Sequence, residues 1–254
     1  MWLLALVGAA VVVAAVLRPA WLSAALFAIA YGLDPQRPSH TYTMGGALLP
    51  LEARKLGMFG GFLIVVLGLI VSGRHRAAAF PPRRITALLV GFVGLMAADG
   101  ANALFYDLTW PHLYTPDLRL RLASGLLTGL AMAALLVPAA NGTLWRRIHL
   151  VPSLAGARDL LGALFVCGAF YLLVDARPAL LYYPVAIIGI VGLLLEMFLI
   201  NLILVLTISR RIGVADSWRD ALAPATVAAV LIIAELAGMS LVRYLTLGDI
   251  TSAM

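Results

Sequence analysis

The run LLYYPVAIIGIVGLLLEMFLINLILVLTIS, residues 180–209, decides the fold class of this chain. It is longer than the roughly 20 apolar residues that an α-helix needs to cross a bilayer. A helix of this length should therefore tilt or protrude. Pro184 falls near its start, where the first turn of a helix tolerates proline. The run predicts a membrane-spanning helix that contains a single carboxylate, Glu196.

The composition extends this interpretation to the whole chain. Of the 254 residues, 63% are hydrophobic and 12% are charged, whereas a soluble domain carries about 25% charged residues. Residues 20–32 are apolar but too short to span comfortably, so we interpret them as a half-helix or an interfacial segment. We predict an all-α polytopic transmembrane bundle in one domain, 1–254, with about seven spans and eight as the alternative. The seven runs are roughly 1–17, 56–73, 85–105, 120–138, 157–174, 180–208 and 221–244.

The loops between these runs differ in charge. On one side they carry the arginines 74, 76, 83, 84, 146, 147, 210, 211 and 219, whereas acids offset the basic residues on the other side. An excess of Lys and Arg marks the cytoplasmic face. We therefore predict a bacterial inner-membrane protein with a cytoplasmic N-terminus and an extracytoplasmic C-terminus. The net charge of +6 reflects this orientation, and we expect no nucleic-acid partner.

Polar residues inside the predicted spans form a candidate intramembrane cluster. Asp99, Glu196 and Glu235 lie about 13 or 14 residues from the cytoplasmic ends of their runs, so they should share one layer roughly 20 Å deep. Charged groups in a bundle interior pair with one another or mark a functional cavity. Both interpretations stay open at this point. The candidate residues are Asp99, Asn102, Glu196, Glu235, Arg54, Arg119 and Arg121.

A second group of polar residues falls in the outer loop that precedes residue 56. This candidate outer-loop motif comprises Asp34, Arg37, Ser39, His40 and Glu52. Its histidine, like the other three, lies in a predicted loop, so no imidazole is placed to ligate haem within a span. A metal site formed by His40 and His112 with nearby carboxylates is a less favoured alternative. We predict no catalytic residues, no metal and no cofactor, and a bound lipid remains open.

Three ordered motifs resemble a known group of membrane proteins. They are DPQRPSHTYTMGGALLPLEARKLGMFGGFL (34–63), AADGANAL (97–104) and LYTPDLRLRLASGLLTGLAMA (113–133). Over residues 30–138 they are similar to the predicted membrane proteins grouped as domain of unknown function 2085, and residues 139–254 add further helices. The resemblance implies a membrane fold and supplies no activity. Where the family pattern carries cysteines, this chain has Asp34, Glu52 and Lys55, so no thiol chemistry carries over.

Two further features shape the functional expectation. Small residues in GMFGGF (57–62) and GLLTG (125–129) allow close contacts between helices, and no catalytic constellation is present among the motifs. We expect a non-catalytic membrane subunit that packs against other integral membrane proteins within a larger energy-transducing or transport complex. One alternative is a small-molecule or lipid-headgroup binding or transport protein that uses the acidic layer. Another is an extracytoplasmic-facing enzyme around Asp34, His40, Glu52 and Asp99.

Overall fold

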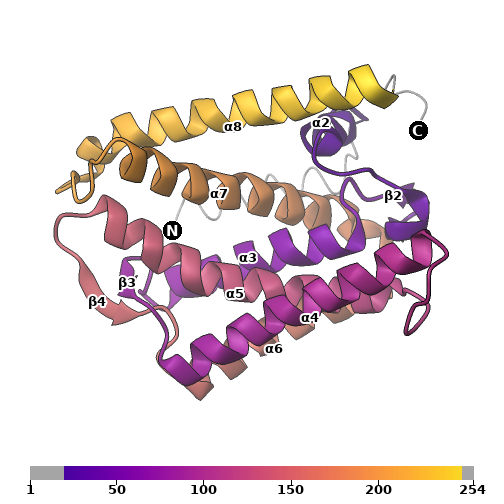
Figure 1. Ribbon diagram of the computed structural model, residues 1–254, viewed down its shortest axis with the longest axis horizontal. Helices are drawn as coiled ribbons and strands as arrows, with labels where there is room; N and C mark the ends of the chain where they lie inside the picture. Colours follow the sequence, from indigo (N-terminus) through magenta and orange to yellow (C-terminus); the bar gives the residue numbers. More distant parts are fainter. Residues whose placement is uncertain (1–19, 248–254) are drawn as a thin grey trace.

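The computed structural model describes residues 20–247. Each long helix runs antiparallel to the next long helix along the chain (Figure 1). Six helices in this part of the chain are long and apolar enough to cross a membrane. They confirm six of the predicted runs, and the predicted run 1–17 lies outside the described residues. The six are α3 (Ala53–Val71), α4 (Arg83–Asp107), α5 (Leu118–Leu144), α6 (Ala157–Ala176), α7 (Tyr182–Ile208) and α8 (Trp218–Leu247).

Short elements occupy the connections at the two ends of the bundle. At the end where α3 begins, β1 (Thr43–Met44) pairs antiparallel with β2 (Ala47–Leu48), and we call this the hairpin end. At the opposite end, β3 (Ala77–Ala79) pairs in parallel with β4 (His149–Pro152). The arginine clusters 74–84, 146–147 and 210–219 lie at this second end, which we call the arginine end. Two 3-10 turns, η1 (Pro38–His40) and η2 (Ala179–Leu181), complete the connections.

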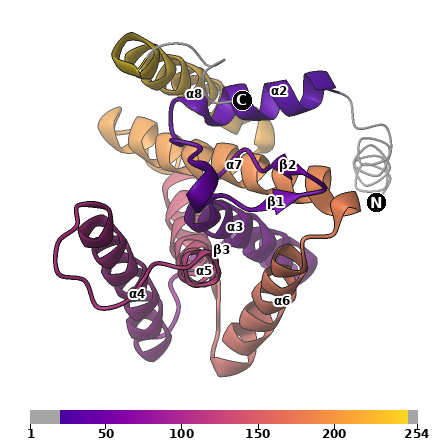
Figure 2. The ribbon, with the colours of Figure 1, turned by 90° about the vertical axis from the view of Figure 1, so that its right-hand side faces the viewer.

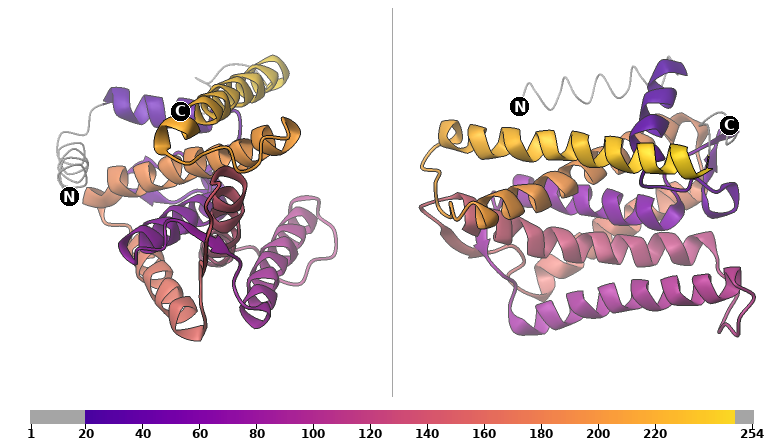
Figure 3. Two further views of the ribbon diagram at one scale, coloured as in Figure 1. Left: turned by 90° about the vertical axis from the view of Figure 1, so that its left-hand side faces the viewer. Right: turned by 45° about the horizontal axis from the view of Figure 1, so that its top comes forward.

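Helix α2 (Ala20–Tyr31) is short and lies crosswise to α8 at the hairpin end (Figures 1 and 3). Its 12 residues reach about 18 Å, which is less than the hydrocarbon thickness of about 30 Å. It contacts α7, and the hydroxyls of Ser23 and Tyr182 lie 3.2 Å apart. Its length and direction agree with the interpretation of residues 20–32 as a half-helix or interfacial segment.

The centre of the bundle is the contact between α3 and α5. A Cβ atom added at Gly129 would lie 2.0 Å from the carbonyl oxygen of Met58, and one added at Gly125 would lie 2.2 Å from that of Arg54. The two helices therefore meet backbone to backbone. Such close approach is the geometry that small residues permit in membrane proteins.

The remaining helices surround this pair unequally (Figure 2). The most apolar stretches of α3 and α5 are 56% and 67% buried, whereas those of α4, α6 and α8 are 22%, 22% and 11% buried. Large apolar side chains on these outer helices are exposed, among them Val90, Phe165 and Ile233. The outer faces of α4, α6 and α8 therefore meet lipid or another apolar surface.

Candidate functional site

Asp34 anchors the loop that joins α2 to α3. Its side chain is buried, with Oδ1 accepting from the backbone N–H of Gln36 at 2.7 Å and Oδ2 from that of Glu52 at 3.0 Å. The ammonium group of Lys55 lies 3.6 Å from Oδ2. Burial raises the pKa of this carboxyl, while the Lys55 charge and the two N–H donors oppose the rise. Asp34 thus fixes Glu52, the residue that precedes α3.

Glu52 and Arg37 extend these contacts toward α4. Arg37 Nε donates to Glu52 Oε1 at 3.1 Å, and its Nη1 donates to Asp107 Oδ2 at 3.2 Å. His40 Nδ1 lies 3.7 Å from the same Glu52 oxygen. Burial lowers the pKa of His40, and the charges of Arg121 and Arg37 lower it further. Arg37 therefore pairs directly with Glu52, and the charge of Arg121 also acts on this carboxylate.

Asp99 is the centre of the deeper part of the cluster. It is 3% exposed and has three donors from three different segments. Arg54 Nη2 of α3 donates to Oδ2 at 2.5 Å, Ser124 Oγ of α5 donates to Oδ2 at 3.3 Å, and Tyr114 Oη donates to Oδ1 at 2.8 Å. Burial and the hydrogen bond to Asp99 raise the pKa of Tyr114 to about 12. Asp99 therefore joins α3, α4, α5 and the 108–117 loop.

Asn102, on the same face of α4, holds that loop through its backbone. Its Nδ2 donates to the carbonyl of Tyr114 at 2.9 Å, and its Oδ1 accepts from the N–H groups of Leu113 at 2.8 Å and Tyr114 at 3.3 Å. Tyr114 is thus fixed by Asn102 through the backbone and by Asp99 through its hydroxyl.

The two arginines that begin α5 have different surroundings. Arg119 Nε donates to Asp175 Oδ1 at 3.0 Å, at an exposed contact with the end of α6. Arg121 is buried and interacts electrostatically with Asp107, Asp99 and Glu52, and with the like charge of Arg54. Among the described residues its guanidinium makes no hydrogen bond or salt bridge. Ser39 is exposed, and its hydroxyl forms no hydrogen bond within residues 20–247.

Glu196 and Glu235 share no hydrogen-bond partner with Asp99 among the described residues. Glu196 is buried on α7, and within residues 20–247 its Oε2 has no hydrogen-bond partner. Glu235 is exposed on α8 and accepts a hydrogen bond from Asn201 Nδ2 at 2.8 Å. No hydrogen bond joins any two of the three carboxylates in the described part of the chain. The predicted layer therefore consists of an Asp99 cluster and a separate polar contact between α7 and α8.

Sequence reasoning missed three residues of these sites. Asn201 lies five residues after Glu196 within an apolar run, and Ser124 lies three residues after Arg121. Ser124 could have been found as a polar residue at helical spacing from a charged one, and Asn201 as a polar residue within an apolar run. Tyr114 gave no such signal because tyrosine is common in loops at a membrane surface.

The carboxylates of the cluster are already engaged by hydrogen-bond donors, which limits the chemistry they can perform. Asp34, Glu52 and Asp99 are each held by separate donors. In residues 20–247 no three His, Cys, Asp or Glu side chains are placed to hold a metal ion. His112 instead contacts the carbonyl of Trp110 at 3.1 Å, at an exposed position. The observed contacts are those of a polar joint between helices.

Comparison with known proteins places part of this chain in context. No curated protein and no solved structure matches it. A family model does match, and it covers the loop of Arg37 and His40, all of α3 and α4, and most of α5. The resemblance predicted over residues 30–138 is thereby confirmed: residues 35–135 of this membrane protein match the family described as predicted membrane protein (DUF2085).

Proposed function

We propose that this chain is a non-catalytic subunit of a bacterial inner-membrane complex, and that α8 packs against another integral membrane protein. The observation that carries this proposal is the position of Glu235. It lies near the middle of α8, it is exposed, and its one hydrogen bond among the described residues is to Asn201. A second membrane helix that covers this carboxylate would supply the environment that lipid does not.

The cost of leaving Glu235 against lipid supports a covering partner. A charged side chain at the centre of a membrane helix costs about 2.5–3.5 kcal/mol on insertion scales. One turn away on α8, a Cβ atom added at Gly238 would meet nothing within 4 Å. A partner helix could approach closely there and donate a hydrogen bond to the carboxylate. Exposed apolar side chains at helical spacing from Glu235, such as Leu231 and Val242, would be covered with it.

The polar cluster at the hairpin end supports a role without catalysis. Its carboxylates are bound to arginines, hydroxyls and backbone N–H groups that come from several helices. The arginine end bears the excess positive charge, so we place it in the cytoplasm and the hairpin end outside. In the proposed complex the partner would contact α8 within the bilayer, and the polar cluster of this chain would lie near the outer surface.

The complex can be tested by purification from native membranes. The tagged full chain, extracted in mild detergent, should carry a second integral membrane protein in fixed proportion. Glu235→Leu should lower that protein's recovery about tenfold or more, because a hydrogen bond to a charged group contributes about 1.5–3 kcal/mol. Ile233→Ala, at an exposed position on the opposite face of α8, serves as the matched control and should keep the partner.

Two results would count against this proposal. A wild-type chain that elutes alone as a monomer would contradict the proposal that it belongs to a complex. Equal recovery of the partner with Glu235→Leu and with Ile233→Ala would instead show that the interface does not include the Glu235 face of α8.

Arg121 favours a second candidate function, the binding of a small anion at the hairpin end. Its buried guanidinium lacks a hydrogen-bond partner among the described residues, although acids surround it. Glycerol 3-phosphate is a suitable soluble probe because it carries the phosphate of a lipid headgroup. At 100 times its Kd it should stabilise the protein by about 2.7 kcal/mol. Arg121→Gln should abolish the thermal shift and Arg119→Gln should keep it, whereas no shift in the wild type would exclude this candidate.

A further inference from the structure

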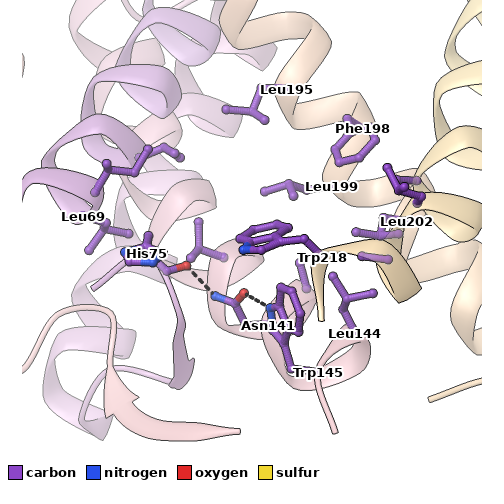
Figure 4. A pocket seen from close by; sticks show the side chains of 17 residues that line it. Leu69, His75, Asn141, Leu144, Trp145, Leu195, Phe198, Leu199, Leu202 and Trp218 are labelled. Carbon is purple, nitrogen blue, oxygen red and sulfur yellow. Dashed lines mark hydrogen bonds between the residues drawn. The ribbon is translucent and has the colours of Figure 1, made fainter. Parts of the chain in front are cut away.

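An apolar cavity of about 320 Å³ lies near the arginine end, between α3, α5, α7 and α8 (Figure 4). This volume falls in the range of small-ligand sites, which begins at about 300 Å³. Hydrocarbon side chains form most of its wall, including Leu69 of α3, Val137 of α5, and Phe198 and Leu199 of α7. The cavity therefore suits a hydrocarbon occupant.

The polar group of Asn141 in the cavity wall is already engaged. Its Nδ2 donates to the carbonyl of His75 at 2.9 Å, and its Oδ1 accepts from Trp145 Nε1 at 3.1 Å (Figure 4). The same Nδ2 also donates to the carbonyl of Ala77 at 2.9 Å. These bonds use both donors of the amide and an acceptor site. Asn141 thus fixes the Trp145 ring at the cavity wall and leaves little polarity for a ligand.

The positively charged side chain of Arg76 lies beside the cavity at the arginine end. The guanidinium of Arg76 lies 4.1 Å from the centre of the Trp145 ring and 5.4 Å from that of Trp218. Both rings line the cavity. Within residues 20–247 Arg76 forms no salt bridge, whereas Asp159 and Asp216 at the same end of the bundle pair with Arg74 and Arg146. The cavity therefore has an apolar interior and an unneutralised cation beside two of its aromatic walls.

We propose that this cavity binds one acyl chain of an anionic glycerophospholipid, and that the lipid phosphate pairs with Arg76. A water-soluble anion would leave the apolar wall unfilled, whereas a neutral apolar molecule would leave the Arg76 charge unused. Tryptophan and arginine side chains also concentrate at the membrane surface, where the headgroup of such a lipid lies. A phospholipid supplies an acyl chain for the apolar interior and a phosphate that can lie beside Arg76.

The headgroup, more than the acyl chain, decides which lipid occupies the cavity. An acyl chain that enters from the bilayer exchanges one hydrocarbon environment for another, so burial alone gives little preference. A basic residue at a membrane surface favours anionic lipid by about fivefold. We expect phosphatidylglycerol to occupy the cavity about fivefold more than phosphatidylcholine with the same chains.

Photolabelling in vesicles tests both parts of the proposal. The full chain is reconstituted in phosphatidylcholine with a trace of phosphatidylglycerol or phosphatidylcholine that carries a diazirine in one acyl chain. Peptide mass spectrometry should locate the label on cavity residues such as Leu199, with the expected preference for phosphatidylglycerol. Arg76→Gln should remove the preference, because it lowers labelling by the anionic phosphatidylglycerol more than labelling by the zwitterionic phosphatidylcholine. The control Arg83→Gln, at the same end of the bundle, should retain the preference.

A filled cavity provides the second arm of the test. Ala225 of α8 lines the cavity and Ala229 does not, so Ala225→Trp should lower labelling of Leu199 by both lipids while Ala229→Trp leaves it unchanged. Undiminished labelling in Ala225→Trp would overturn the cavity assignment. Equal labelling of the wild type by the two lipids, or a preference that survives Arg76→Gln, would overturn the headgroup assignment. Arg76→Gln adds no volume to the cavity, so it decides the headgroup assignment even if Ala225→Trp fails to assemble.

Discussion

Gly129→Ala should lower the thermal unfolding midpoint of the purified protein by about 10 °C. The added Cβ would lie 2.0 Å from the carbonyl oxygen of Met58 and 2.6 Å from the amide nitrogen of Phe62. Both neighbours are backbone atoms of α3, so the clash is relieved only when α3 and α5 move apart. Overpacking costs about 1–3 kcal/mol where side chains can adjust, and we expect the upper end of that range here.

The control for this prediction is another helical glycine. A Cβ atom added at Gly168 of α6 would meet nothing within 4 Å. Alanine is also favoured over glycine in a helix by about 1 kcal/mol, so Gly168→Ala should keep or raise the midpoint. Fluorescence-detected size-exclusion chromatography after heating would measure both variants. Similar midpoints for the two variants would show that α3 and α5 do not pack as described.

This contact shows how far the sequence could predict the fold. Length and hydropathy predict spans because a backbone in lipid must satisfy its own hydrogen bonds, and the helix does so in sequence order. The segments GMFGGF and GLLTG also predicted close helix contacts. Which helix each one meets could not be predicted, because lipid-facing and core-facing surfaces are both apolar in a membrane protein. The pairing of Gly129 with Met58 thus depends on shape and not on hydrophobic pattern.

The candidate site was predicted in part for a similar reason. Arg54 and Asp99, both members of the predicted intramembrane cluster, are in contact at 2.5 Å, and opposite charges that enter neighbouring spans make such a pair predictable. Counting residues along each span placed Asp99, Glu196 and Glu235 at one depth. Depth is a single coordinate, and the three residues lie on α4, α7 and α8. Their lateral separation depends on the order of helices around α3 and α5, which sequence spacing does not encode.

Asp99→Asn should destabilise the protein by about 3 kcal/mol, because it leaves the partly buried Arg54 guanidinium without its counter-charge. Asparagine is nearly isosteric, but its single side-chain oxygen can keep the hydrogen bond from Tyr114 or the one from Ser124, because these two donate to different oxygens of Asp99. The loss therefore combines the charge with one hydrogen bond. Membrane abundance and the unfolding midpoint would both fall. Asp107→Asn is the matched control, because its partner Arg37 is 48% exposed and such pairs contribute about 0–1 kcal/mol.

A second substitution separates a structural role of Asp99 from a binding role. If Asp99 chiefly neutralises Arg54, Asp99→Asn combined with Arg54→Met should recover most of the lost stability, since an apolar replacement of a buried ion pair is often neutral or stabilising. A binding carboxylate would give a different pattern. Asp99→Asn would then keep wild-type abundance and midpoint, and the Arg54 substitution would restore nothing. That pattern would mean that Asp99 is held by Arg54, Tyr114 and Ser124 for contact with a ligand.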